Sequence, residues 1–167
     1  FSLGDKSDIR FIFERIGFSS KMNEIEAAVG IGALDVFNDV LKKRRENLYY
    51  LMDKFSRFEP YLTTIKKEPY EDIGPHALPI IIEEDSPFTR NQLVDFMEKN
   101  GIDTRSLFQS MPTQCPGFAF LKAKASGFPN AEYIGNNGLH VGVHQDLGLK
   151  ECDYILDTIQ IFLKKNT

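Results

Sequence analysis

The stretch His76-Ala77-Leu78-Pro79-Ile80-Ile81-Ile82 is a short run of apolar and β-branched residues, a composition that is typical of a β-strand. A comparable run extends from Tyr61 to Lys66, and the acidic turn from Glu68 to Gly74 separates the two. We therefore expect two strands in this part of the chain. Two further segments, Ile102 to Phe108 and Gly138 to Val143, are also expected to be extended.

Two helices are expected before these strands. Asn23 and Glu26 have the reciprocal spacing of an N-terminal capping box, so the first helix begins near Asn23. The apolar residues from Asp35 to Phe58 keep the helical period and predict a long second helix. Gly30 and Gly32 each cost a helix up to about 1 kcal/mol relative to Ala, so we expect the first helix to pack closely against a partner.

Three shorter helices are expected after the strands begin. Thr89 and Gln92 form a second capping box, and Gly101 ends that helix. A short helix is predicted from Ala131 to Asn137, and a final amphipathic helix follows Leu149. This order of elements predicts an α+β fold, in which helices pack on a small and mostly antiparallel sheet.

Composition excludes several classes of protein. The 167 residues suit one domain, and 20 Lys and Arg against 24 Asp and Glu give a net charge of -4. No basic block could follow a phosphate backbone and no apolar run approaches the ~20 residues of a membrane span, so neither nucleic acid nor membrane is an expected partner. The 2 cysteines lack the spacing of a zinc site, so no metal is expected and a reducing cytoplasmic setting is the default.

The residues of this chain do not assemble a complete active site, so no catalytic residue is identified. His140 and His144 would point the same way along a strand, but a metal site needs a third ligand; structural histidines and polar contacts to a ligand or subunit are the alternatives. Cys115 has no neighbouring base, and Cys152 falls on the apolar face of the last helix. The chain is therefore expected to supply only part of a site.

Three segments, in order, resemble one family. The first is Ile16-Gly17-Phe18-Ser19-Ser20-Lys21-Met22-Asn23, followed by Glu24-Ile25-Glu26-Ala27-Ala28-Val29-Gly30. The second is Gly101-Ile102-Asp103-Thr104-Arg105, and the third runs from Phe128-Pro129-Asn130 through Gly138-Leu139-His140-Val141-Gly142-Val143-His144 into the last helix. Together they are similar to the DegT/StrS-type pyridoxal-phosphate-dependent sugar aminotransferases over nearly the whole chain.

The resemblance implies that the chain is the C-terminal part of a type I pyridoxal-phosphate (PLP) fold. Residues 1–35 would lead from a large domain that precedes Phe1, and would carry a loop, 17–23, that reaches the cofactor of the partner subunit in a homodimer. Residues 36–167 would form the small domain. The large domain would hold the cofactor and its Schiff-base Lys, so none of the lysines of this chain is assigned that role.

The resemblance also implies which residues bind ligands. Ser19, in place of the family's usual Asn, and Lys21 would contact the cofactor phosphate. Arg105 and Thr113 would lie near the substrate, with His76 and His144 as further substrate-binding candidates. Many members of the family carry a His after the Thr-Arg step, whereas residues 107–114 of this chain contain none, so the substrate contacts differ from theirs.

The function implied is transfer of an amino group, through PLP, from an amino acid such as glutamate to a nucleotide-linked keto-deoxysugar in surface polysaccharide or lipopolysaccharide biosynthesis. Two alternatives stay open. Gly142-Val143-His144 has some likeness to the family's sugar 3-dehydrases, in which a His replaces the Schiff-base Lys. The chain could also be a non-catalytic α+β interaction module.

Overall fold

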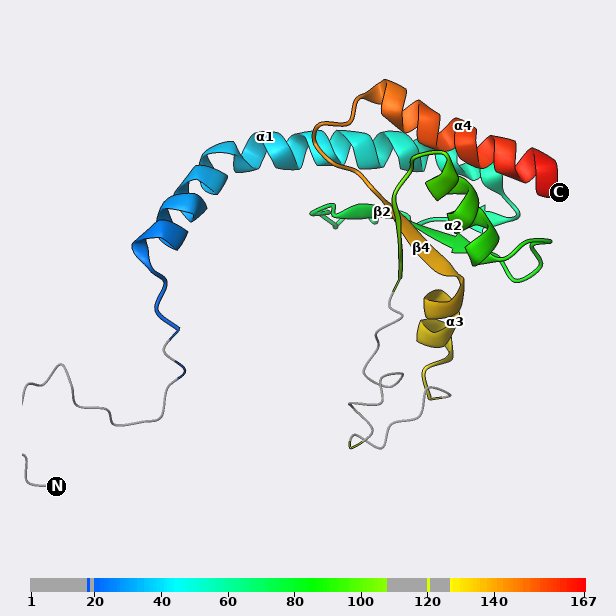
Figure 1. Ribbon diagram of the computed structural model, residues 1–167, viewed down its shortest axis with the longest axis horizontal. Helices are drawn as coiled ribbons and strands as arrows, with labels where there is room; N and C mark the ends of the chain where they lie inside the picture. The colour runs from blue at the N-terminus through cyan, green and yellow to red at the C-terminus, as the bar shows by residue number, and fades with distance from the viewer. Residues whose placement is uncertain (1–17, 19, 108–119, 121–126) are drawn as a thin grey trace, which may run out of the picture. The chain divides into compact units, whose positions relative to one another are not determined.

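A computed structural model describes residues 18, 20–107, 120 and 127–167 of the chain (Figure 1). The chain divides into two compact units, Phe1–Val36 and Phe37–Thr167. Helix α1 (Glu24–Phe55) has residues in both units, and every strand belongs to the second. Ser19, Cys115 and Thr113, and the predicted loop from Ser110 to Gly117, lie outside the described residues.

The second unit contains a four-stranded sheet in the order β1-β2-β4-β3, with every neighbouring pair antiparallel. Its strands are β1 (Leu62–Thr63), β2 (Ala77–Ile82), β3 (Thr104–Ser106) and β4 (Gly138–Gly142). The predicted α+β class and the antiparallel sheet are therefore confirmed.

The strand expected from Tyr61 to Lys66 is shorter than predicted, because only Leu62 and Thr63 pair with β2. The pairing stops as the chain approaches Pro79, which has no N–H to donate to a neighbouring strand. The hydroxyl of Thr64 instead donates to the carbonyl of Pro79 at 2.5 Å, so a side chain continues the contact that the backbone does not make.

The prediction of two helices before the sheet is wrong, because α1 runs unbroken from Glu24 to Phe55. Gly30 and Gly32 lie inside it, and their cost is small enough for the hydrogen-bonded ladder to continue. The predicted capping box is confirmed: Asn23 Oδ1 accepts from the N–H of Glu26 at 2.8 Å, and Glu26 accepts in return. A Cβ added at either glycine meets nothing within 4 Å, so the close packing expected of them stays a prediction.

The remaining helices follow the predicted pattern. The capping box of Thr89 begins α2 (Arg90–Lys99), and Gly101 follows it with a positive φ of 76°. The chain then forms α3 (Pro129–Asn137) and α4 (Leu149–Asn166), while a short 3-10 turn, η2 (Ser56–Phe58), follows α1.

One face of the sheet forms the hydrophobic core. Leu78 and Ile80 of β2, with Leu139 and Val141 of β4, are at most 1% exposed. In Figure 1 the second-unit part of α1 and helix α4 run side by side, with α2 in front of the sheet, and all three helices contribute buried side chains to this core. Those side chains include Leu48, Leu51 and Phe55 of α1, Leu93 and Met97 of α2, and Ile155, Leu156 and Ile159 of α4.

The opposite face carries different residues, because side chains alternate along a strand. Ala77, Pro79 and Ile81 of β2 are only partly buried, and so is His140 of β4. Gly142, two residues after His140, is exposed. This open face carries His140 and, directly opposite it on β3, Arg105.

Leu78→Ala is expected to lower the free energy of unfolding by about 2–5 kcal/mol, because it removes a fully buried side chain and leaves a cavity in a close-packed core. The same change at Leu149, which is 57% exposed, is the matched control and should shift stability by about 0.5 kcal/mol or less. Urea unfolding of both variants measures the difference, and equal losses would contradict this packing.

Candidate functional site

A cleft of about 270 Å³ lies on the open face of the sheet, at the end where Ala77 pairs with Gly142. All 3 histidines of the chain line it. The full set of lining residues is Arg44, His76, Ala77, Asp103, Arg105, His140, Gly142, Val143 and His144, all from the second unit.

The strand register brings the basic residues together. His140 lies opposite Arg105 on β3 and opposite Pro79 on β2. Residues directly opposite on antiparallel strands have Cβ atoms about 4.5–5.5 Å apart. The ring of His76, which precedes β2, meets the ring of His140 edge-on, with 5.7 Å between centroids.

The pKa of His140 is shifted from its ordinary value. Burial lowers it first, and electrostatic interaction with the nearby His76 and Arg105 lowers it further. The neutral imidazole is therefore the favoured form of His140 near neutral pH.

Arg105 is held by neighbours on its own strand. Its Nη1 donates to Asp103 Oδ1 at 2.6 Å and to the carbonyl of Thr104 at 2.7 Å. Both charged side chains are largely exposed, at 66% and 75%, so this ion pair contributes little to stability. It orients the guanidinium over the cleft and leaves Nη2 and Nε for other partners.

His144 lies on the connection that leaves β4. Its Nδ1 accepts from the backbone N–H of Asp146 at 3.3 Å, so the neutral ring carries its proton on Nε2. The same Nδ1 lies 3.4 Å from the Asp146 carboxylate, which would pair with the ring once protonated.

Helix α1 holds this connection in place. The buried Asn47 donates from Nδ2 to the carbonyl of His144 at 2.8 Å and to that of Leu147 at 3.2 Å. Three residues earlier on the helix, Nε of Arg44 donates to Gln145 Oε1 at 3.0 Å. These bonds join residues about a hundred positions apart in sequence. They hold the connection that borders the cleft beside His144.

Of the predicted substrate-binding residues, the structure brings His76, Arg105 and His144 into one cleft. Thr113 and the cofactor-binding candidate Ser19 lie outside the described residues, and Lys21 is an exposed residue of the first unit. Nothing in the sequence places Arg44 beside His144. His140, for which the sequence leaves a metal ligand, a structural histidine and a polar contact to a ligand or subunit open, also lines this cleft.

The described part of the chain contains no group of three His, Cys, Asp or Glu side chains placed to share a metal ion. No helix within the same residues is long and apolar enough to cross a bilayer. Cys152 is a buried free thiol, as expected from its place on the apolar face of α4.

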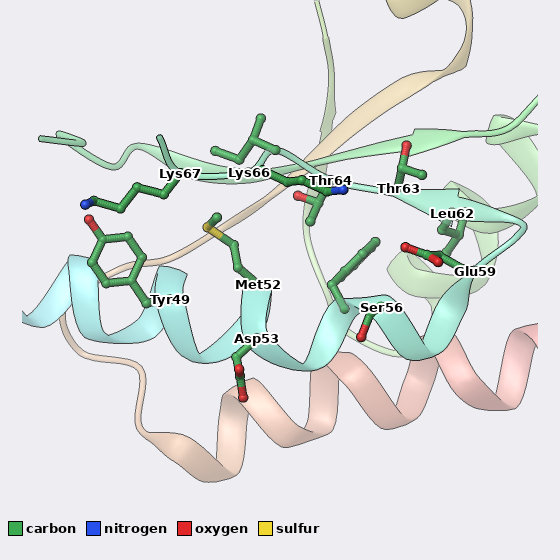
Figure 2. A pocket seen from close by; sticks show the side chains of 12 residues that line it. Tyr49, Met52, Asp53, Ser56, Glu59, Leu62, Thr63, Thr64, Lys66 and Lys67 are labelled. Carbon is green, nitrogen blue, oxygen red and sulfur yellow. The ribbon is translucent and has the colours of Figure 1, made fainter. Parts of the chain in front are cut away.

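A larger cleft of about 400 Å³ lies between α1 and the segment that contains β1 (Figure 2). Its lining includes Met52, Phe55 and Leu62. Lys66 and Lys67 lie across from the helix, and Figure 2 shows Asp53 pointing away from the cleft. No set of polar groups converges there comparable to the basic cluster on the open face of the sheet, which is therefore the candidate site.

The sequence profile of the DegT/DnrJ/EryC1/StrS aminotransferase family matches residues 2–160. The chain therefore belongs to this family, as the three sequence segments indicated.

Individual relatives agree with this assignment. The chain is 25% identical, over 99% of its length, to the lipopolysaccharide biosynthesis protein RfbH of Salmonella typhimurium. It is 26% identical, over 90% of its length, to the UDP-4-amino-4,6-dideoxy-N-acetyl-beta-L-altrosamine transaminase of Campylobacter jejuni. It also matches the crystal structure of a GDP-4-keto-6-deoxymannose-3-dehydratase with a trapped PLP-glutamate geminal diamine, with a TM-score of 0.78 and 29% identity over 93% of this chain.

The chain spans about two fifths of these relatives: 38% of RfbH, 39% of the transaminase and 40% of the dehydratase chain. The predicted C-terminal domain of a type I PLP fold agrees with the match to the dehydratase structure.

Lys21, the predicted contact of the cofactor phosphate, is exposed just before α1, where its ammonium is accessible to an anion. The backbone N–H groups of Glu26 and Ala27 are already bonded to Asn23, so the capped start of α1 does not offer them to an anion. A phosphate contact in this part of the chain would therefore use the Lys21 side chain.

The Asn47 contacts predict a stability effect with a defined pH dependence. Asn47→Ala should lower the free energy of unfolding by about 1–3 kcal/mol, because both hydrogen bonds from its buried amide to the carbonyls of His144 and Leu147 are lost. Asn47→Asp should cost more at pH 7, because a buried carboxylate would face those carbonyl oxygens.

Burial and the facing oxygens raise the pKa of the introduced carboxyl above its value in the unfolded chain, so the native state favours its protonated, donating form. The Asn47→Asp variant should therefore gain stability relative to Asn47→Ala as the pH falls from 7 to 4. Chemical denaturation at both pH values measures this, and parallel pH profiles would contradict the assigned contacts.

Proposed function

We propose that the chain is the C-terminal part of a PLP-dependent enzyme that transfers an amino group to a nucleotide-linked keto-deoxysugar. The observation that carries this proposal is the cleft that unites Arg105, His76 and His144 in a member of this family. The relatives' roles in nucleotide-sugar and lipopolysaccharide chemistry support the same substrate class and pathway.

The cleft residues contribute binding and orientation. The guanidinium of Arg105 and the ring of His76 present donors from one side, and Asp103 fixes the direction of the guanidinium. His144, held by the Asn47 contact and by Asp146, can donate from Nε2 to a sugar hydroxyl or keto oxygen. PLP, when bound, acts as an electron sink for the reacting centre.

The remaining parts of the enzyme are proposed from the family. We place the Schiff-base Lys in a large domain that precedes this chain, with 1–35 leading from it and 36–167 as the small domain. Ser19 and Lys21 would meet the cofactor phosphate of a homodimer partner, and Thr113 would contact the substrate. A nucleotide-sugar substrate and an amino-acid donor place the enzyme in the cytoplasm.

A second reaction, removal of the sugar 3-hydroxyl, is favoured by a specific observation. The structure matched at 29% identity is a 3-dehydratase, whereas the transaminase named above is 26% identical. Both reactions need the same nucleotide-linked keto sugar and the same cofactor, so the cleft described here serves either one.

The test is to incubate the whole PLP-loaded protein with nucleotide-linked 4-keto-6-deoxyhexoses and nitrogen-15-labelled glutamate. Amino transfer places the label in the sugar, whereas dehydration gives an unlabelled sugar that has lost its 3-hydroxyl; mass spectrometry separates the two. A protein that makes neither product from any such sugar would overturn the proposal.

Arg105→Ala and Lys21→Ala should each lower kcat/KM at least about tenfold, because each removes a positive charge facing an anionic ligand. Lys66→Ala, which removes the same charge from the other cleft, is the matched control and should leave kcat/KM unchanged. Unchanged kinetics in Arg105→Ala and Lys21→Ala would remove both residues from the site.

A further inference from the structure

We propose that His140, Arg105 and His76 form an oxyanion-binding site that takes up a proton at His140 when the anion binds. The inference rests on the proposed function for the source of its ligand, which is either the diphosphate of the nucleotide-linked sugar or a carboxylate of the amino donor.

The first argument is the register of the sheet. Arg105 and His140 are directly opposite on β3 and β4, and the ring of His76 touches that of His140. A positive charge on His140 directly opposite Arg105 would destabilise the sheet, so the protein alone favours the neutral ring. An anion placed between these groups would make a charged His140 favourable.

The second argument is the space above them. Ala77 and Gly142 are paired on the floor of the cleft, and both are small. Gly142 lies on the same face as His140, and a Cβ added to it meets nothing within 4 Å. The cleft of about 270 Å³ is therefore large enough for a phosphate or carboxylate group beside the basic side chains.

The third argument is the charge balance around His140. Arg105 on β3, His76 before β2, Arg44 on α1 and His144 after β4 are the basic groups of the lining, and Asp103 is its single acidic residue. Asp103 Oδ1 is bonded to Arg105 Nη1, and Asp103 is not among the groups that shift the pKa of His140. Arg105 keeps Nη2 and Nε for the ligand.

Proton uptake follows from these neighbours. Burial and the two adjacent basic groups lower the pKa of His140, so the ring is neutral in the free protein near pH 7. A bound oxyanion favours the charged ring and raises that pKa again. Binding therefore draws a proton from solution, and affinity rises as the pH falls from 8 to 6.

The experiment is isothermal titration calorimetry of the whole protein with inorganic pyrophosphate and, separately, glutarate, a dicarboxylate without an amino group to react with PLP. Each titration is run in two buffers of different ionisation enthalpy, which reports the protons taken up. Wild type should bind one of the two probes about tenfold more tightly at pH 6 than at pH 8, as one linked proton allows. His140→Gln should lose the proton uptake, and comparison with this variant removes the probe's own titration.

Two further variants separate site from fold. Arg105→Gln should lower the affinity for the probe at least about tenfold, because it removes the fixed charge of the site. Gly142→Leu should block binding while leaving every charge in place, since its side chain would fill the open space above the strand. Lys67→Gln, in the other cleft, is the charge-matched control and should bind as wild type does.

The outcomes are distinct. Loss of pyrophosphate binding in Arg105→Gln and Gly142→Leu assigns the site to the diphosphate, and loss of glutarate binding assigns it to the donor carboxylate. Wild-type affinity and proton uptake for both probes in all three cleft variants would overturn the inference, even if the enzyme is active. Specific binding in a protein that turns over no nucleotide sugar would leave the anion site standing and remove only the proposed function.

Discussion

The contact between the Asn47 amide and the carbonyls of His144 and Leu147 connects the helical layer to the sheet connection that borders the cleft. A buried amide is expensive unless it is hydrogen-bonded, and here Nδ2 of Asn47 donates to two backbone carbonyls, while its Oδ1 has no hydrogen-bond partner among the described residues. The position of His144, and of the wall that Arg44 and Gln145 complete, depends on this contact.

The two faces of the sheet differ in role: one packs against the helices, and the other lines the cleft. Leu78, Ile80, Leu139 and Val141 supply the buried contacts that hold α1, α2 and α4 to one face. The alternate positions are therefore free to carry small and basic residues, and the stability supplied by the apolar face offsets the cost of placing a partly buried His140 opposite Arg105. An arrangement that costs the fold a little is expected where a ligand is bound.

The contacts in the cleft differ in how strongly they affect stability and protonation. The exposed Arg105–Asp103 pair adds little to stability, so its use is to direct the guanidinium. The half-buried His140 is more sensitive, since loss of solvent and two basic neighbours act on its pKa in the same direction. A cleft in which basic side chains surround one titratable ring suits an anionic ligand, as the proposed function requires.

Local chemistry made much of this protein readable from its sequence. The capping boxes at Asn23 and Thr89, the positive φ at Gly101 and the apolar run of β2 depend on neighbouring residues, and the structure confirms each of them. The expected break between two helices does not occur in α1, because the cost of Gly30 and Gly32 is too small to end a helix. Three segments also identified the family. The cleft could be identified only from the tertiary structure. Its walls depend on the register that sets Arg105 opposite His140, and on bonds from Arg44 and Asn47 to residues about a hundred positions away. Both arise from packing between distant segments, which no local pattern encodes.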